Sequence, residues 1–460
     1  METGKHTLLK RLLLLSGALL VLLVAIVVIA SVWWDWRASG RLDRALIALE
    51  AREEPVTLEQ IQELYTTEGL ARNAAPIYLA AAKRCECAMK ETGSQLPALP
   101  IVGTGQLPAL GERLPNDMAR RIERFLSGQK EALLKVEEAR PIKDSVYEGD
   151  LTAGAAFELP HLKPLRDLAR VLALQALMQI QRGDLDACAQ TIADQLKLAA
   201  SLKREPACIS QLVRIALEDI ALETLERMLS FGSPSPERSA ELSRLLADQV
   251  DVARMRMPVL HQRAMAVDIL RQMGSGTLEE SVREADGSRI LLWLGRGRAK
   301  DESVWCLERL NEMVDTTRLS PLEASRKAKE VDDRIEAEGS KRRREISVGW
   351  SPAGLLLPSL SGIHEQAIVA NTRLSMARVA LAIESFRRET GRLPQTLQEL
   401  VPKYLDALPK DVFSGSRLRY VLDENGYRVY SVGPDGNDDG GTQDRNQGNT
   451  DADVIFEVRR

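Results

Sequence analysis

The chain has 460 residues, of which 44% are hydrophobic and 28% charged, and its formal net charge is −4 at pH 7. This length and apolar content allow two or three domains with buried cores, and the slightly negative charge argues against nucleic acid as a partner. Before roughly the last seventy residues, Leu, Ala, Arg and Glu dominate and aromatic residues are rare, so the composition predicts mainly helices there.

An unbroken apolar segment runs from Leu12 to Trp34, directly after a short basic tail. It is long enough to cross a bilayer, which takes roughly 20 apolar residues. A cleavable signal usually has only about 7–15 apolar residues. Trp33, Trp34 and Trp36 would form an aromatic belt at the membrane–water interface. We therefore predict that residues 1–36 are a cytoplasmic tail and a transmembrane signal anchor.

The orientation of this anchor follows from the short N-terminal tail, because the basic residues on the two sides of the span nearly balance. We expect the tail in the cytoplasm and the bulk of the chain outside it. Two alternatives stay open. Cleavage after Val28-Ile29-Ala30 would release the protein, and a buried helix of a soluble core could also have this composition.

Residues 37–345 read as successive amphipathic helices that Pro and Gly interrupt near 96–115, 160–164 and 232–236. The clearest unit is an αα-hairpin over residues 165–202, in which Arg182-Gly183-Asp184 turns the chain. It resembles a tetratricopeptide repeat in its small-residue helix and Gly-Asp turn, although the aromatic positions of that repeat are empty and no second copy has a steady period. We predict a tetratricopeptide-like helical-hairpin array that serves as a scaffold or spacer with a binding groove.

This helical region contains no recognisable catalytic motif. A nucleophile elbow, a phosphate-binding loop and the paired histidines of a zinc protease are all missing. Glu218, Asp219 and Glu223 lie at helical spacing, where carboxylates usually form solvated faces or ion pairs. The five cysteines lack metal-ligand spacing, and we expect free thiols, with a Cys188–Cys208 pair as the alternative. We therefore expect no catalytic residues and no organic cofactor.

After a predicted linker at residues 346–364, the pattern changes to that of a small α+β domain at residues 365–460. A long apolar-faced helix ends at Gly391, and a short helix, a hairpin and a last strand follow. The hairpin is expected to turn at Asp423-Glu-Asn-Gly426 through Asn-Gly chemistry. The expected elements after the linker cover residues 365–390, 397–404, 419–422, 427–432 and 454–458.

The loop between the last two strands consists almost wholly of Gly, Asp and Asn. Six carboxylates crowd against Arg445, which is self-repelling unless a cation lies among them. Over residues 435–440, oxygen side chains alternate and a glycine takes the sixth place, the spacing of a Ca²⁺-binding loop. The six carboxylates are Asp435, Asp438, Asp439, Asp444, Asp451 and Asp453.

The motif order GRLP, LPKDVFSG, YRVYSVGPDG, acidic loop and DADVIF resembles the globular domain of the type II secretion major pseudopilin over about residues 371–458. This resemblance implies a helix packed on an antiparallel sheet and one structural Ca²⁺. It implies ligands at Asp435 of GPDG, at Asp453 of DADV and at the carbonyl of Val432, with Asp451 as a neighbour. The N-terminus departs from a pseudopilin, because Gly4 to Lys10 lacks the processing-site glutamate. The whole chain resembles uncharacterised bacterial envelope proteins with a helical middle and a pseudopilin-like end.

Two ligand sets are compatible with the loop. One uses Asp435, Asn437 and Asp439 at alternate positions; the other joins Asp435 to Asp451 and Asp453. We favour the second set, because closing a loop of about fifteen to twenty residues offsets a real entropy cost. A solvated acidic loop without metal is the alternative.

These observations together predict a membrane-anchored, extracytoplasmic binding or scaffold protein with a structural Ca²⁺. The resemblance places it in a bacterial inner membrane as a single-pass protein with a periplasmic body. It also implies partners in the envelope, among type II secretion or surface-filament components. An extracytoplasmic enzyme with a carboxylate-lined groove in the helical region is the alternative function.

Overall fold

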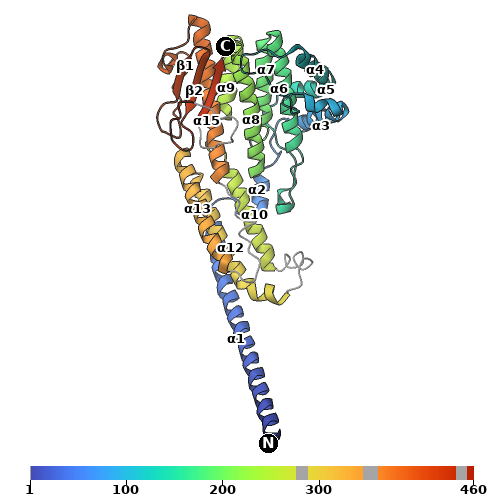
Figure 1. Cartoon of the computed structure of the whole chain (residues 1–460), viewed down its shortest axis with the longest axis vertical. Coiled ribbons are helices and arrows are strands. Elements are labelled where there is room, and N and C mark those ends of the chain that lie inside the picture. Colours follow the sequence, from blue (N-terminus) through green and yellow to red (C-terminus); the bar gives the residue numbers. More distant parts are fainter. Residues whose placement is uncertain (1, 276–288, 346–360, 442–452) are drawn as a thin grey trace. The chain divides into compact units, whose positions relative to one another are not determined.

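The computed structural model describes residues 2–275, 289–345, 361–441 and 453–460. As predicted, these residues form a mainly helical structure with a small antiparallel sheet near the C-terminus (Figure 1). The α-helices are α1 (Glu2–Glu50), α2 (Leu58–Leu64), α3 (Ala75–Thr92), α4 (Asn116–Gly128), α5 (Lys130–Ala139), α6 (Leu162–Arg182), α7 (Leu185–Ala200), α8 (Cys208–Leu229), α9 (Pro236–Gln249), α10 (Arg256–Ser275), α12 (Arg289–Thr316), α13 (Pro321–Glu345) and α15 (Ser361–Thr390). The 3₁₀ turns are η1 (Gly93–Ala98), η2 (Leu151–Ala156) and η3 (Leu397–Leu400), and the strands are β1 (Arg419–Asp423), β2 (Gly426–Ser431) and β3 (Val454–Arg459).

Contacts between residues divide the chain into two compact units. The first unit joins α1 to most of α10, to nearly all of α12 and to the C-terminal part of α13. The second unit holds α3 to α9 together with α15 and the sheet. This division cuts across the predicted domains at 37–345 and 365–460, and most of the predicted linker lies outside the described residues.

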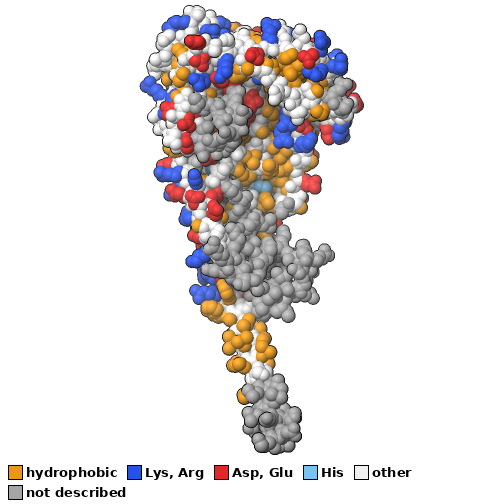
Figure 2. All heavy atoms as spheres, viewed as in Figure 1, with side chains coloured by type: hydrophobic (Ala, Val, Ile, Leu, Met, Phe, Trp, Pro, Cys, Tyr) orange, Lys and Arg blue, Asp and Glu red, His pale blue; other side chains and the backbone are white. Residues whose placement is uncertain are grey.

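In the first unit, α1 continues well past the predicted anchor to Glu50. Its segment from Leu14 onward is long and apolar enough to cross a bilayer, by length and composition. Every side chain from Leu14 to Ala30 is exposed, and Figure 2 shows hydrophobic side chains covering this helix. A tetratricopeptide-like stacking of the helices and the side of the membrane on which the body lies stay predictions.

The C-terminal half of α1 packs closely on α12. Gly297 allows this approach, because a Cβ at that position would lie 2.7 Å from the backbone nitrogen of Asp35. Lys300 Nζ donates to the Asp35 carboxylate at 2.8 Å. Arg263, which is fully buried, joins α10 to the segment after α1 through Glu54 at 2.9 Å. The first unit is therefore held by polar contacts as well as apolar ones.

In the second unit, the predicted αα-hairpin is present as α6 and α7. Gly183 ends α6 in the left-handed conformation at φ +77°, and Asp184 caps α7 by accepting from the Ala187 N–H at 3.0 Å. The side chains of Cys188 and Cys208 are free thiols, and burial raises the pKa of Cys208 to about 12. The hairpin therefore forms without the disulfide that had been left open.

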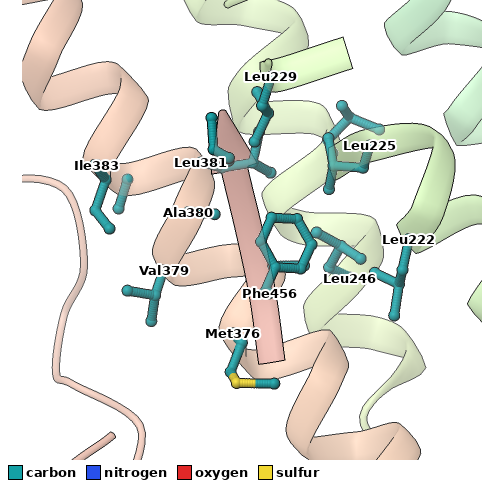
Figure 3. Close-up of a cluster of buried hydrophobic side chains, with 14 of the residues drawn as sticks. Leu222, Leu225, Leu229, Leu246, Met376, Val379, Ala380, Leu381, Ile383 and Phe456 are labelled. Carbon is teal, nitrogen blue, oxygen red and sulfur yellow. The ribbon is translucent and has the colours of Figure 1, made fainter. Parts of the chain in front are cut away.

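The sheet and α15 share one hydrophobic core with α7, α8 and α9. Figure 3 shows Phe456 of β3 among leucines of α8 and α9 and apolar side chains of α15. Met376, Ala377, Val379 and Ala380, which point to different sides of α15, are all fully buried. A helix that is apolar nearly all round is buried on all sides, and α15 accordingly lies between the sheet and the helices.

The three strands are antiparallel in the order β1-β2-β3. Asp423 pairs with Gly426, so the hairpin turns over Asp423-Glu-Asn-Gly426 as predicted, with Glu424 and Asn425 as the two central residues and Gly426 at the fourth position. Gly426 is required there because a Cβ would lie 1.9 Å from the Val458 carbonyl oxygen. On the outer side of β3, the Glu457 N–H donates to Glu226 of α8 at 3.0 Å. Side chains of α8 therefore satisfy backbone groups of this edge strand.

The shared core leads to a prediction for Phe456→Ala. Removing this fully buried ring should lower the free energy of unfolding by about 3–5 kcal/mol. Chemical denaturation of the full chain in detergent, followed by far-UV circular dichroism, measures the change. Leu422→Ala, at an exposed position on β1, is the control and should change stability by at most about 0.5 kcal/mol. A strand signal that melts separately from the helices would contradict the shared core.

Candidate metal centre

The acidic loop starts and ends at neighbouring positions of the sheet. Ser431, the last residue of β2, pairs with Val454, the first residue of β3. The intervening loop covers residues 432–453, of which 432–441 and 453 are described. Its two ends are therefore held side by side by the strand pairing itself, whatever occupies the loop.

Asp411 anchors the start of the loop, although the sequence did not single it out. Its carboxylate is fully buried and accepts from the Ser431 hydroxyl at 2.6 Å, the Ser414 hydroxyl at 2.7 Å and the Phe413 N–H at 3.0 Å. The Val432 N–H also points at it, at 3.4 Å. The signal in the sequence was a lone aspartate in LPKDVFSG, followed by the small polar residues that turn a chain around a carboxylate.

Asp453 closes the other end of the loop. Its Oδ2 accepts from the Gly441 N–H at 2.7 Å, and Arg428 donates to the Gly441 carbonyl at 2.7 Å. Gly441 has φ +65°, and a Cβ there would lie 3.0 Å from the Tyr430 ring, so glycine suits this position. The residues on the two sides of the undescribed segment are thus tied to each other and to β2.

The Asp453 carboxylate is nevertheless incompletely satisfied. Only 5% of the residue is exposed, and its Oδ1 has no hydrogen-bond partner in the described structure. Burial raises the pKa of Asp453, and the nearby charges of Asp438 and Asp439 raise it further. A buried carboxylate oxygen without a donor is unfavourable and suits a cation.

Asp438 is instead occupied by protein groups. It accepts from Arg419 Nε at 2.7 Å and from the Tyr430 hydroxyl at 3.1 Å. The N–H of Gly440 is the main cause that lowers the pKa of Asp438, and Arg419 and Tyr430 contribute to the same effect. This side chain therefore pins the acidic loop against β1 and β2.

The predicted ligands are only partly brought together. Asp435 is exposed and accepts from both the backbone N–H and the side-chain amide of Asn437, at 3.0 and 2.9 Å. Val432 is buried beside Asp411, and Asp451 lies outside the described residues. Among the residues described, no group of three or more His, Cys, Asp or Glu side chains is placed to hold a metal. The choice between the two ligand sets, including the place of Asp439, stays a prediction.

Two carboxylates of the alternative enzyme site, Glu218 and Asp219, lie in ion pairs. Glu218 is fully buried and meets Arg254 through two bonds of 2.8 Å and Arg214 at 3.1 Å. Burial lowers the pKa of Arg214, and Glu218 opposes that effect. Asp219 pairs with Arg373. These pairings satisfy the charges and leave little freedom for acid–base chemistry at Glu218.

A groove of about 610 Å³ lies between α9 and α15 in the second unit. Its wall is rich in hydroxyl groups from Ser239, Ser243 and Ser385. The one carboxylate among its lining residues, Glu389, bonds Lys403 and the Tyr404 hydroxyl. The groove offers a surface for binding, and its lining has no pair of free carboxylates.

In comparisons with known proteins, no family model, no curated protein and no solved structure matches this chain. The assignment of a function therefore depends on the geometry described above and on the sequence motifs.

Asp411→Ala should destabilise the second unit. It would leave the Ser431 and Ser414 hydroxyls and the Phe413 N–H without their buried acceptor, which should lower the free energy of unfolding by roughly 2–4 kcal/mol. Urea denaturation of the full chain measures the loss. Asp406→Ala replaces an exposed aspartate nearby and is the control. Equal effects of the two substitutions would refute the anchoring role of Asp411.

Proposed function

We propose that this protein is a single-pass, membrane-anchored binding or scaffold protein whose C-terminal acidic loop is locked by a structural Ca²⁺. The observation that carries the metal site is the buried Oδ1 of Asp453, which lacks a partner in the described structure while Asp438 and Asp439 add negative charge nearby. A divalent cation would supply the positive charge that the protein groups around Asp453 do not.

The preferred ligand set combines Asp453 with Asp451, two positions earlier in the chain, and with Asp435 and the carbonyl of Val432. Ca²⁺ takes six to eight oxygen ligands, including carboxylates, backbone carbonyls and water. Asp411 and Asp438 hold the surrounding backbone through protein contacts, so they support the loop and are not needed as ligands. The bound ion would join the two ends of the loop and give it one defined surface.

The anchor is supported by the exposed apolar part of α1. Leu14, Leu19 and Ile29 are 67–73% exposed, which is unfavourable in water and favourable in lipid. Arg37 stacks over Trp33 with its guanidinium carbon 5.5 Å from the ring centroid. This pair joins an interfacial aromatic to a basic side chain at the end of the apolar segment.

The partner class comes from the motif resemblance to the pseudopilin domain. The anchor would lie in the bacterial inner membrane and the body in the periplasm. The body, with a locked loop at its C-terminal end, would contact secretion or filament components in the envelope. The groove between α9 and α15 and the acidic loop are the surfaces that such a partner would contact. The paired state of Glu218 and Asp219 gives the enzyme alternative no support.

Calcium should stabilise the full chain in detergent. At about 100 times the dissociation constant, a single site contributes about 2.7 kcal/mol of stability, which differential scanning fluorimetry detects as a higher Tm than in chelator. In Asp453→Asn this response should be strongly reduced, because the neutral amide removes a negative charge from the ligand set. Asp406→Asn should keep the response of the natural chain. A Tm that is the same in Ca²⁺ and in chelator would remove the metal from the proposal.

In chelator, the raised pKa of Asp453 should make the stability of the chain depend on pH. The folded state binds its proton more tightly than the unfolded chain does, so stability should fall as pH rises from the usual aspartate pKa through the raised value. Asp453→Asn has no such charge and should be at least as stable as the natural chain at pH 7 in chelator. The same substitution therefore weakens the Ca²⁺ response while it removes the cost of a buried charge.

Single substitutions also separate the two ligand sets. Asp451→Asn should strongly weaken the Ca²⁺ response if the loop ends are joined by the ion, because a negative charge is lost from the ligand set, whereas Asn437→Ala should weaken it if the alternate-residue set binds. Isothermal titration of the purified full chain with Ca²⁺ measures both affinities. Loss of binding in Asn437→Ala with normal binding in Asp451→Asn would reverse our preference.

The anchor is tested by alkaline carbonate extraction of bacterial membranes. The full chain should stay in the membrane pellet, and a chain without residues 2–34 should move to the supernatant, because the apolar part of α1 is removed. Protease added to spheroplasts should digest the body. A soluble protein whose N-terminus begins after Ala30 would show that the segment is a cleaved signal.

A further inference from the structure

A second pocket with unsatisfied polar groups lies in the first unit, beside the end of the apolar segment of α1. Its volume is about 620 Å³. α1, α12 and α13 all contribute to its wall. The lining residues that matter here are Trp34, Asp301, Glu302, Glu338, Lys341 and Arg342.

The position of Trp34 indicates how deep this pocket would lie relative to a bilayer. It belongs to the aromatic group that ends the apolar segment, where tryptophans prefer the membrane–water interface. Its indole N–H donates to Asp301 at 2.7 Å, and Arg41 also pairs with Asp301, at 2.5 Å. The pocket therefore lies at the level of phospholipid headgroups, an inference that rests on the membrane anchor proposed above.

Glu302 is the carboxylate of this pocket that has no ion pair with a described residue. It is only 3% exposed, and its Oε2 has no hydrogen bond in the described structure. The neighbouring carboxylates are occupied, since Asp301 binds Arg41 and Trp34, and Glu338 accepts from the Trp305 indole. A buried carboxylate oxygen without a donor calls for a cationic N–H group from a ligand.

Two cationic side chains of α13 line the same pocket. Lys341 is exposed and has no ion pair with a described residue. Arg342 stacks over the Trp305 ring at 4.9 Å, and among the described residues it has no carboxylate partner. These two groups are placed to bind an anionic oxygen near Glu302, because guanidinium and ammonium groups both bind phosphate.

We propose that this pocket binds the headgroup of a phospholipid that carries both a phosphodiester and a primary ammonium, as in an ethanolamine phospholipid. The ammonium donates to Glu302, and the phosphodiester binds Lys341 and Arg342. A choline headgroup has no N–H to donate to Oε2. A headgroup with only negative charge leaves the Glu302 oxygen without a donor.

The test uses the full chain, purified in detergent and stripped of lipid. Native mass spectrometry measures the binding of ethanolamine, choline and glycerol phospholipids with the same acyl chains. The natural chain should bind the ethanolamine lipid about tenfold more tightly than the choline lipid. Glu302→Gln should remove that preference and should not weaken the binding of the glycerol lipid, because it takes away a negative charge beside the anionic headgroup. Lys341→Gln should weaken all three lipids through the shared phosphate.

Glu336→Gln, an exposed position on α13 outside the pocket, is the matched control and should behave like the natural chain. Circular dichroism checks that each variant is folded. If Glu302→Gln does not fold, Lys341→Gln decides the result, because its side chain is exposed. Equal binding of the ethanolamine and choline lipids by the natural chain would overturn the proposal. So would unchanged lipid binding in Lys341→Gln.

Carbonate extraction of the same variants separates this inference from the proposed function. A chain that stays in the membrane but shows no headgroup preference would refute the lipid site and leave the anchor in place. A chain that is released from the membrane would refute both. The Ca²⁺ response, which depends on residues of the second unit, is unaffected by either outcome.

Discussion

The second unit depends on the burial of α15 between the sheet and helices α8 and α9. Side chains from every side of α15 are buried, and Phe456 of β3 completes the same core. Polar contacts reinforce this packing, since Glu226 of α8 and Ser230, directly after α8, accept from the backbone N–H groups of Glu457 and Arg459. These contacts cover the open edge of the sheet, so the last strand is held by helices as well as by β2.

This arrangement gives the acidic loop a rigid base. Both of its ends lie on strands that are fixed in the shared core. Asp411 holds the end of β2, and Asp438 holds the loop against side chains of β1 and β2. A loop supported in this way loses less entropy when an ion joins its ends than a free loop would. The proposed Ca²⁺ would therefore complete a structure that the protein has already built in large part.

Buried charges in the two units follow a common rule. Arg263 pairs with Glu54 in the first unit, and Glu218 pairs with two arginines in the second. Such pairs satisfy charges that would otherwise be costly to bury. Asp453 and Glu302 differ, because neither forms an ion pair with a described residue and each leaves a buried carboxylate oxygen without a donor in the described structure. That difference is why both proposals of bound ligands start from these two residues.

Local patterns in the sequence predicted the elements well. The apolar segment of α1, the turn at Gly183-Asp184 and the helix break at residues 232–236 all depend on neighbouring residues, and the structure contains each of them. The loop was predicted with the same kind of reasoning, because alternating oxygens and glycines are a local signal. The role of Asp411 was not predicted. A buried aspartate is recognised only when its donors come together, and one of them, Ser431, belongs to a distant strand.

The sequence by itself determined which segments are helices or strands, where one helix is apolar enough to cross a membrane, and where negative charge accumulates. Periodicity, capping and turn chemistry act over a few residues and can be read along the chain. Only the tertiary structure decided that α15 and the sheet share a core with α8 and α9, and that Asp453 and Glu302 keep buried oxygens without donors. Burial and hydrogen-bond satisfaction depend on residues that are far apart in sequence, so no local pattern records them.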